Sequence, residues 1–290
     1  MGAVFGAALP VYLLVFVRMV GMFAFNPLFS RRNVPAIVRA GLALVCMAVI
    51  APGVPYAPQV QDRLASAVLL ELVIGLACGY IFQAFYYMLF MAGDFMDMQF
   101  GMAMSKVLDP GTNLQLSTSG SFLNILFSLY FFATNSHLVM IRILSASFDL
   151  VPAGGSSFPV GLPGYLIDLT IEAFSLVLRL ALPFVAVEFV LELSMGILMK
   201  LIPQIHVFVI NIQFKMLLGL ILLLAFAGPV ASFVDNYMLL MLQNLQYAFS
   251  AFLPTFSSFW FSFTHSMPPT TSRDASSIPA ITSSLTPLAL

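Results

Sequence analysis

Runs of twenty or more mostly apolar residues follow one another along most of this 290-residue chain. A helix needs roughly 20 such residues to cross the hydrocarbon core of a bilayer. We therefore expect about six membrane-spanning helices, with five or seven as alternatives. The candidate runs are 4–29, 36–56, 64–92, 120–143, 166–200 and 205–233, with 237–263 following.

The composition excludes a soluble globular domain. The chain is 61% hydrophobic and only 8% charged, with a mean hydropathy of +1.02, whereas ordinary domains are about half apolar and a quarter charged. The net charge of −1 offers no basic surface for nucleic acid. No HExxH motif, cysteine pair or glycine-rich phosphate loop occurs, so we expect no enzyme, cofactor or metal. Cys46 and Cys78, both inside apolar runs, are expected to be buried thiols.

These observations predict an all-α integral membrane protein. Two connections stand out, 31–39 with its arginines and the polar, glycine- and proline-containing 151–166. From residue 267 onward the chain is rich in Pro, Ser and Thr, which predicts a disordered tail.

Charged residues interrupt the apolar runs at positions that lipid disfavours. Each charge at the bilayer centre costs about 2.5–3.5 kcal/mol on insertion scales. Glu188, Glu192 and Lys200 share one helical face, because they lie four and eight residues apart. Either these groups pair and join helices, or they form a proton or ion relay. The seven charges are Arg18, Glu71, Glu172, Arg179, Glu188, Glu192 and Lys215.

Glycines and prolines also occur in the expected spans. Gly75 and Gly79 form a GxxxG pattern, which would let another helix approach closely. Prolines in or beside several runs would free backbone groups that neighbouring protein must then satisfy. Both features predict helices that pack against protein.

The Met-rich stretch (91–110, MAGDFMDMQFGMAMSKVLDP) combines charge, methionine and glycine. Methionine is unbranched and adapts to whatever touches it. The stretch leads into a polar segment in which Asp-Pro-Gly signals a turn. Core filling is one interpretation of the methionines. The other is a soft apolar ring that gates the passage of polypeptides.

Five motifs, in order and spacing, resemble the FliR/SctT family of type III export gates. The resemblance runs from the N-terminus to about residue 260. The motifs lie at 16–44 (FVRMVGMFAFNPLFSRRNVPAIVRAGLAL), 71–80 (ELVIGLACGY), 92–110, 136–154 (SHLVMIRILSASFDLVPAG) and 203–223 (PQIHVFVINIQFKMLLGLILL).

The resemblance implies a non-enzymatic subunit of a flagellar export gate, present as a single copy with several FliP and FliQ subunits. FlhB and FlhA are further implied partners, and unfolded flagellar proteins are the implied substrates. The implied location is the flagellar basal body at the bacterial inner membrane. It further implies a FliP-like half over 1–160, with the gate loop near 92–116, and a FliQ-like half over 161–266, ahead of the 267–290 tail.

Residue roles carried over by the resemblance fall into three groups. The pore gasket would be formed by Met102, Met104, Val107 and Leu108. The plug would be formed by Asp109, Pro110, Gly111, Thr112, Asn113, Leu114, Gln115 and Leu116. Subunit packing or ion pairs would involve Arg18, Glu71, Gly75, Gly79, Asp94, Asp97, Glu188, Glu192, Pro203, Gln204, Phe208 and Lys215.

The resemblance implies two roles for the Met-rich stretch. Its apolar side chains would exclude water and ions, because a narrow apolar constriction dewets. Asp94 and Asp97 would anchor it to its neighbours.

The alternative function is a proton- or ion-coupled small-molecule transporter, motivated by the embedded acids and proline-broken helices.

Overall fold

The structure is a computed structural model that describes residues 2–29, 34–54, 63–102, 117–154, 161–202 and 207–250. All of these belong to one compact unit, Met1–Leu253. Within them the regular secondary structure is helical and no strand occurs, which confirms the predicted all-α class.

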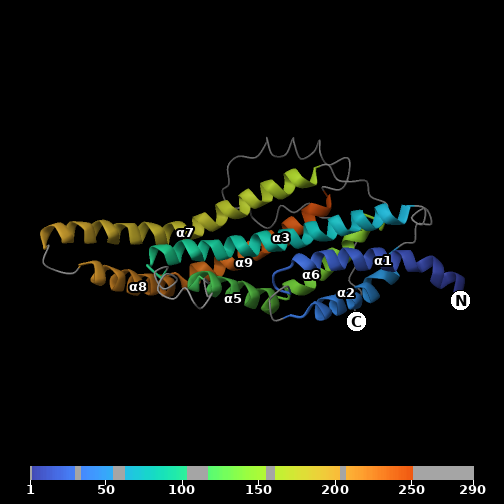
Figure 1. Cartoon of the computed structure of the whole chain (residues 1–290), viewed down its shortest axis with the longest axis horizontal. Helices are drawn as coiled ribbons and strands as arrows, with labels where there is room; N and C mark the ends of the chain where they lie inside the picture. The colour runs from blue at the N-terminus through green and yellow to red at the C-terminus, as the bar shows by residue number, and fades with distance from the viewer. Residues whose placement is uncertain are drawn as a thin grey trace. The chain divides into compact units, whose positions relative to one another are not determined.

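The helices follow the apolar runs in order (Figure 1). They are α1 (Gly2–Phe25), α2 (Ala36–Ile50), the short 3-10 helix η1 (Ala51–Gly53), α3 (Leu64–Gln99), α5 (Thr118–Ala133), α6 (Ser136–Leu150), α7 (Leu162–Leu201), α8 (Val207–Ala225) and α9 (Ala227–Ser250).

α3 is the central element, because it packs against α1, α5, α7 and α9. Its contact with α1 is a close backbone approach: a Cβ atom added at Gly75 would overlap the Arg18 carbonyl oxygen, and one at Gly79 would lie 2.8 Å from the Met22 carbonyl oxygen. Gly21 faces them from α1, 3.1 Å from such a Cβ at Gly75. The GxxxG pattern thus marks a tight helix contact inside the chain.

The later helices share the core of the earlier ones. α9 packs against α3, α5 and α6, and α7 packs against α3. The Tyr237 hydroxyl donates to the Phe85 carbonyl at 3.1 Å, which joins α9 to α3. The Tyr165 hydroxyl donates to the Asn244 carbonyl at 2.8 Å, which joins α7 to α9. Cys46 and Cys78 are buried and free, as expected.

Two predicted spans are bent pairs of helices. The run 120–143 breaks between α5 and α6, which meet at 69°. Asn135 has a φ of 57° at this break, a left-handed conformation that asparagine tolerates better than most residues. The predicted boundary between the last two runs, near residue 235, is wrong: α8 ends at Ala225, and α9 follows at 63°. Pro229 accounts for this break, because it has no N–H to continue the helix.

These breaks change the number of spans. In the described residues three helical stretches are long and apolar enough to cross a membrane, Ala36–Gly53, Leu64–Gln99 and Leu162–Leu201. Counting each bent pair as one span gives five, and Leu9–Phe25 of α1 is a shorter apolar helix. Five was an alternative to the expected six.

α3 extends past the predicted end of its apolar run at residue 92 and continues to Gln99. The first half of the Met-rich stretch is therefore helix, with Asp94 and Asp97 on it. Gly93 does not end α3, because it lies where α5 crosses: a Cβ there would overlap the backbone of Gly120.

The α7–α8 hairpin is the least covered part of the fold. In Figure 1 the C-terminal half of α7 extends past the end of α3, with α8 beside it. Many of its large apolar side chains are exposed, among them Leu182, Phe189, Val190, Ile197, Leu217 and Leu224.

Candidate functional site

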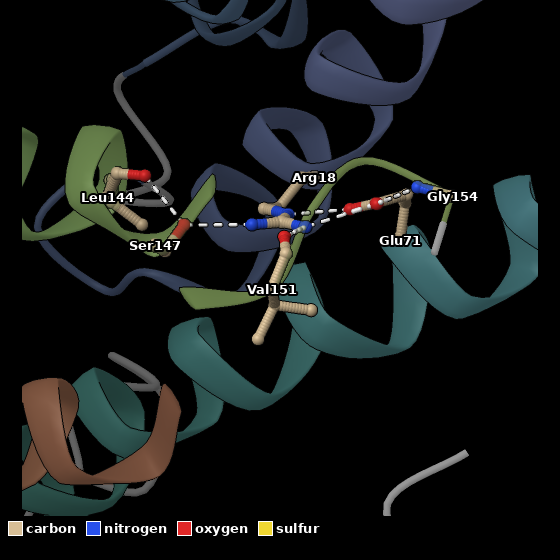
Figure 2. A network of polar contacts seen from close by, with 6 residues as sticks. All are labelled: Arg18, Glu71, Leu144, Ser147, Val151 and Gly154. Atoms are coloured by element: carbon tan, nitrogen blue, oxygen red, sulfur yellow. Dashed lines mark hydrogen bonds and ion pairs between the residues drawn. The ribbon is translucent and has the colours of Figure 1, made fainter. Parts of the chain in front are cut away.

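A fully buried ion pair joins α1 to α3 (Figure 2). Arg18 Nε donates to Glu71 Oε2 at 2.5 Å, and Arg18 Nη2 donates to Glu71 Oε1 at 3.0 Å. Both side chains are 0% exposed. Such a two-point contact is the strong form of an arginine–carboxylate pair.

The same pair holds the end of α6 and the turn that follows it. Arg18 Nη1 donates to Ser147 Oγ at 2.8 Å, and Nη2 also donates to the Val151 carbonyl at 3.0 Å. The Gly154 amide, in a turn with φ +71°, donates to Glu71 Oε1 at 3.0 Å. The guanidinium carbon lies 3.8 Å from the centre of the Phe148 ring. The charges are thus neutralised inside the chain, where they join α1, α3 and α6.

Aromatic packing holds the C-terminal end of α3. The Phe100 side chain is 0% exposed, and its ring makes an edge contact with Phe184 of α7 at 6.2 Å between centroids. It also lies on Gly219 of α8, where an added Cβ would overlap the ring. Gly101 follows with φ +72°, and half-buried Met102 packs against the core.

Asp97 binds the start of α5. Its carboxylate accepts from Ser117 Oγ at 2.7 Å, from the Thr118 amide at 2.5 Å and from the Ser119 amide at 3.1 Å. Ser117 in turn caps α5, accepting from the Gly120 amide at 2.9 Å. Asp97, Ser117 and Ser119 are buried. The expected anchor therefore acts within the chain.

A second acidic cluster lies on the α7–α8 hairpin. Lys215 Nζ of α8 lies 3.2 Å from Glu192 Oε1 of α7, and Glu192 is 57% exposed. Glu188, one turn earlier on α7, is 0% exposed. Both of its carboxylate oxygens lack a hydrogen-bond partner among the described residues. Lys200, on the exposed end of α7, is not the residue that pairs with Glu192.

The remaining predicted residues are spread over the chain. Glu172 and Arg179 are exposed on α7, and Asp94 is half-buried on α3. Phe208 lies on α8. The described part of the chain contains no cluster of ligands suited to a metal ion. Outside the described residues lie Met104, Val107, Leu108, the whole predicted plug (109–116), Pro203 and Gln204.

A sequence model of the family described as "Bacterial export proteins, family 1" matches residues 9–241. The chain belongs to this family. The match begins within α1 and ends within α9, so it applies to nearly the whole described fold and replaces the small-molecule transporter alternative.

Individual relatives agree with the family. The chain is 28% identical to the flagellar biosynthetic protein FliR of Bacillus subtilis over 82% of this chain and 93% of the relative. It is 29% identical to FliR of Escherichia coli over 79% of this chain and 88% of the relative. It is also 25% identical to Yop proteins translocation protein T of Yersinia pestis over 81% and 92%. The chain is thus a bacterial export protein that is similar to flagellar type III components over most of its length.

Sequence reasoning missed how the charges pair. Arg18 and Glu71 lie 53 positions apart, and no helical spacing connects them. Ser147, Ser117 and Gly154, which complete the two buried networks, are ordinary residues in the sequence. For Arg18 and Glu71, the sequence indicated only that charges inside apolar runs need partners.

Proposed function

We propose that this chain is a subunit of the flagellar type III export gate. With FliP-like and FliQ-like subunits it forms the channel through which unfolded flagellar proteins leave the cytoplasm. FlhB and FlhA are its further partners in the apparatus, and its place is the flagellar basal body in the inner membrane. It has no catalytic role, so the driving force comes from other components.

The family match over residues 9–241 carries this proposal. The exposed apolar side chains of the α7–α8 hairpin support it, because a surface of that kind marks contact with protein or lipid. The Glu192–Lys215 pair, with Glu192 57% exposed, and the carboxylate of Glu188, which has no hydrogen-bond partner in the described structure, favour protein over lipid, since lipid cannot satisfy such groups.

Within the gate, we assign the seal to the second half of the Met-rich stretch and to the polar segment that follows it. Met102, Met104, Val107 and Leu108 form the gasket, and residues 109–116 form the plug. The placement of Met102 at the end of a helix held by Phe100 and Asp97 supports this assignment. Flexible methionine side chains suit a seal that must close again around or after varied substrates.

Ion leakage tests the assignment. Cells that carry Met102→Ala with Met104→Ala should leak ions through the assembled gate and still secrete flagellar proteins at a near-normal rate. Met98→Ala is the matched control, because Met98 is 59% exposed on α3 and lies outside the proposed gasket. A double variant that seals as well as Met98→Ala would contradict the gasket.

A further inference from the structure

The C-terminal half of α7 carries more negative than positive charge. Between positions 180 and 199 the sequence has two charged residues, Glu188 and Glu192. The sequence of α8 has one, Lys215. Lys200 lies two turns beyond Glu192, at the exposed end of α7. Two carboxylates therefore share one ammonium group in this part of the hairpin.

Lys215 does not satisfy both carboxylates. Its Nζ lies 3.2 Å from Glu192 Oε1. Lys215 also attracts Glu188, which Glu192 repels, and neither carboxylate oxygen of Glu188 has a hydrogen-bond partner in the described structure. Carboxylates that leave water need donors for their remaining lone pairs as well as a counter-charge. Glu188 is buried, whereas Glu192 is 57% exposed, so Glu192 is the one that a second cation can reach.

The surroundings of Glu192 on α7 are apolar and open. Its large neighbours are exposed, Phe189 by 57%, Leu193 by 54% and Ile197 by 64%. Gly196, one turn after Glu192, is exposed too, and a Cβ there would meet nothing within 4 Å. Spacings of three and four residues place all five on one side of the helix. This side, called the α7 face below, lies on the half of α7 that extends past the end of α3 (Figure 1).

The α7 face sets the chemistry of what covers it. Hydrocarbon chains would suit its apolar side chains but not the Glu192 carboxylate, because a charge in hydrocarbon is costly. A helix suits these surroundings, since it satisfies its own backbone groups, and a glycine lets it approach closely. An acidic helix would be repelled, and an uncharged one would leave the excess negative charge in place.

We infer that the α7 face binds an apolar helix of a companion subunit, and that this helix places one Lys or Arg side chain against Glu192. The inference rests on the proposed function, and it specifies the chemistry of one contact with a companion subunit. Lys215 positions the Glu192 carboxylate from within the chain, and the partner supplies the second cation.

Recovery of companion subunits tests the inference. The full-length chain is co-expressed with FliP-like and FliQ-like subunits and purified through an affinity tag in mild detergent. Glu192→Gln should lower the recovery of these subunits several-fold. Glu192→Lys should lower it more than about tenfold, because like charges that meet across a contact oppose binding. Gly196→Leu should also lower it, because the added side chain fills the space that the helix needs.

Glu172→Lys is the matched control, because it reverses an exposed acidic residue in the other half of α7. It should leave recovery unchanged. Thermal unfolding of each purified chain separates a lost contact from a lost fold. Glu192→Gln should unfold at the temperature of the original chain, since an exposed position tolerates such a change. If Glu192→Lys does not accumulate, Glu192→Gln and Gly196→Leu decide the outcome.

Cross-linking identifies the cation. A photoreactive benzoylphenylalanine in place of Ile197 should cross-link to a companion subunit, within about one helical turn of a Lys or Arg. Replacing that residue by Glu in the companion subunit should restore recovery with Glu192→Lys. A cross-link to lipid alone, or to a segment without Lys or Arg, would overturn the inference.

The recovery experiment separates the inference from the proposed function. If the original chain recovers neither subunit, the proposed function fails and the inference fails with it. If the original chain and its Glu192→Gln, Glu192→Lys and Gly196→Leu variants recover both subunits equally, the proposed function stands and only the inference is contradicted. An equal loss in Glu172→Lys would also contradict it, because the effect would not be specific to the α7 face.

Discussion

Arg18 contacts α3 twice, once through its side chain and once through its backbone. Its guanidinium binds Glu71 through two hydrogen bonds, and its carbonyl oxygen lies against Gly75, one turn further along α3. The close approach at Gly75 brings α1 near enough for the ion pair to form without water. The buried charges and the glycine pattern are thus two parts of one helix contact.

Removal of one charge from this pair should be severe. Glu71→Gln leaves the Arg18 guanidinium buried without a counter-charge, and breaking a buried pair in this way costs about 3–5 kcal/mol. We expect a large fall in the thermal midpoint of the purified chain and a loss of accumulation in membranes. Glu172→Gln, at an exposed position of α7, should change stability by less than about 0.5 kcal/mol.

A double variant separates the charge from the packing. Arg18→Leu combined with Glu71→Leu removes both charges, and apolar replacement of a buried pair is often neutral or stabilising. The double variant should therefore be more stable than Glu71→Gln alone. Equal stability of Glu71→Gln and Glu172→Gln would show that the pair contributes nothing.

Replacing glycine by alanine should change stability in opposite directions at two helical positions. Gly75→Ala must push α1 away, because its Cβ meets backbone, and overpacking of this kind costs about 1–3 kcal/mol. Gly41→Ala on α2 meets nothing within 4 Å and should gain about 0.5–1 kcal/mol from helix propensity. Thermal unfolding of both purified variants checks this. A shift of the same sign in both would contradict the close contact.

Neutralising Glu188 should have the opposite effect to neutralising Glu71. Glu188 is buried and its carboxylate has no hydrogen-bond partner in the described structure. A buried carboxylate without hydrogen bonds costs more than a buried amide, and its attraction to Lys215 offsets only part of that cost, so Glu188→Gln should raise stability by about 1 kcal/mol or leave it unchanged. A loss comparable to that of Glu71→Gln, in the same unfolding assay, would mean that the attraction between Glu188 and Lys215 outweighs the cost of burying the carboxylate.

Much of the helical fold could be predicted from hydropathy, because the described parts of the long apolar runs are helical almost throughout. The details that hydropathy could not supply depend on contacts distant in sequence. The predicted apolar run ends at Ala92, just before the charged residues, whereas α3 continues past Gly93 because α5 crosses there and its first turn binds Asp97. The breaks at Asn135 and before Pro229 depend on single backbone positions.

The candidate site was predictable to a smaller extent. Charges in apolar runs indicated that Arg18 and Glu71 must find partners, but not that they bind one another 53 positions apart. Asp97 was expected to anchor the Met-rich stretch to its neighbours through subunit packing or ion pairs, and in the structure its carboxylate binds the next helix of the same chain. Glu192 was expected to share a face with Lys200, whereas Lys215 of α8 pairs with it, because two helices of a hairpin lie closer than two turns of one helix.

The central claim is that helices with exposed apolar faces and embedded charges are sheltered by companion subunits around a shared channel. Affinity purification of the full-length chain from membranes in mild detergent tests this most directly. We predict that FliP-like and FliQ-like proteins are recovered with it in a stable complex. Recovery of the chain alone, folded and monomeric, with lipid or detergent covering the α7–α8 hairpin, would contradict the account.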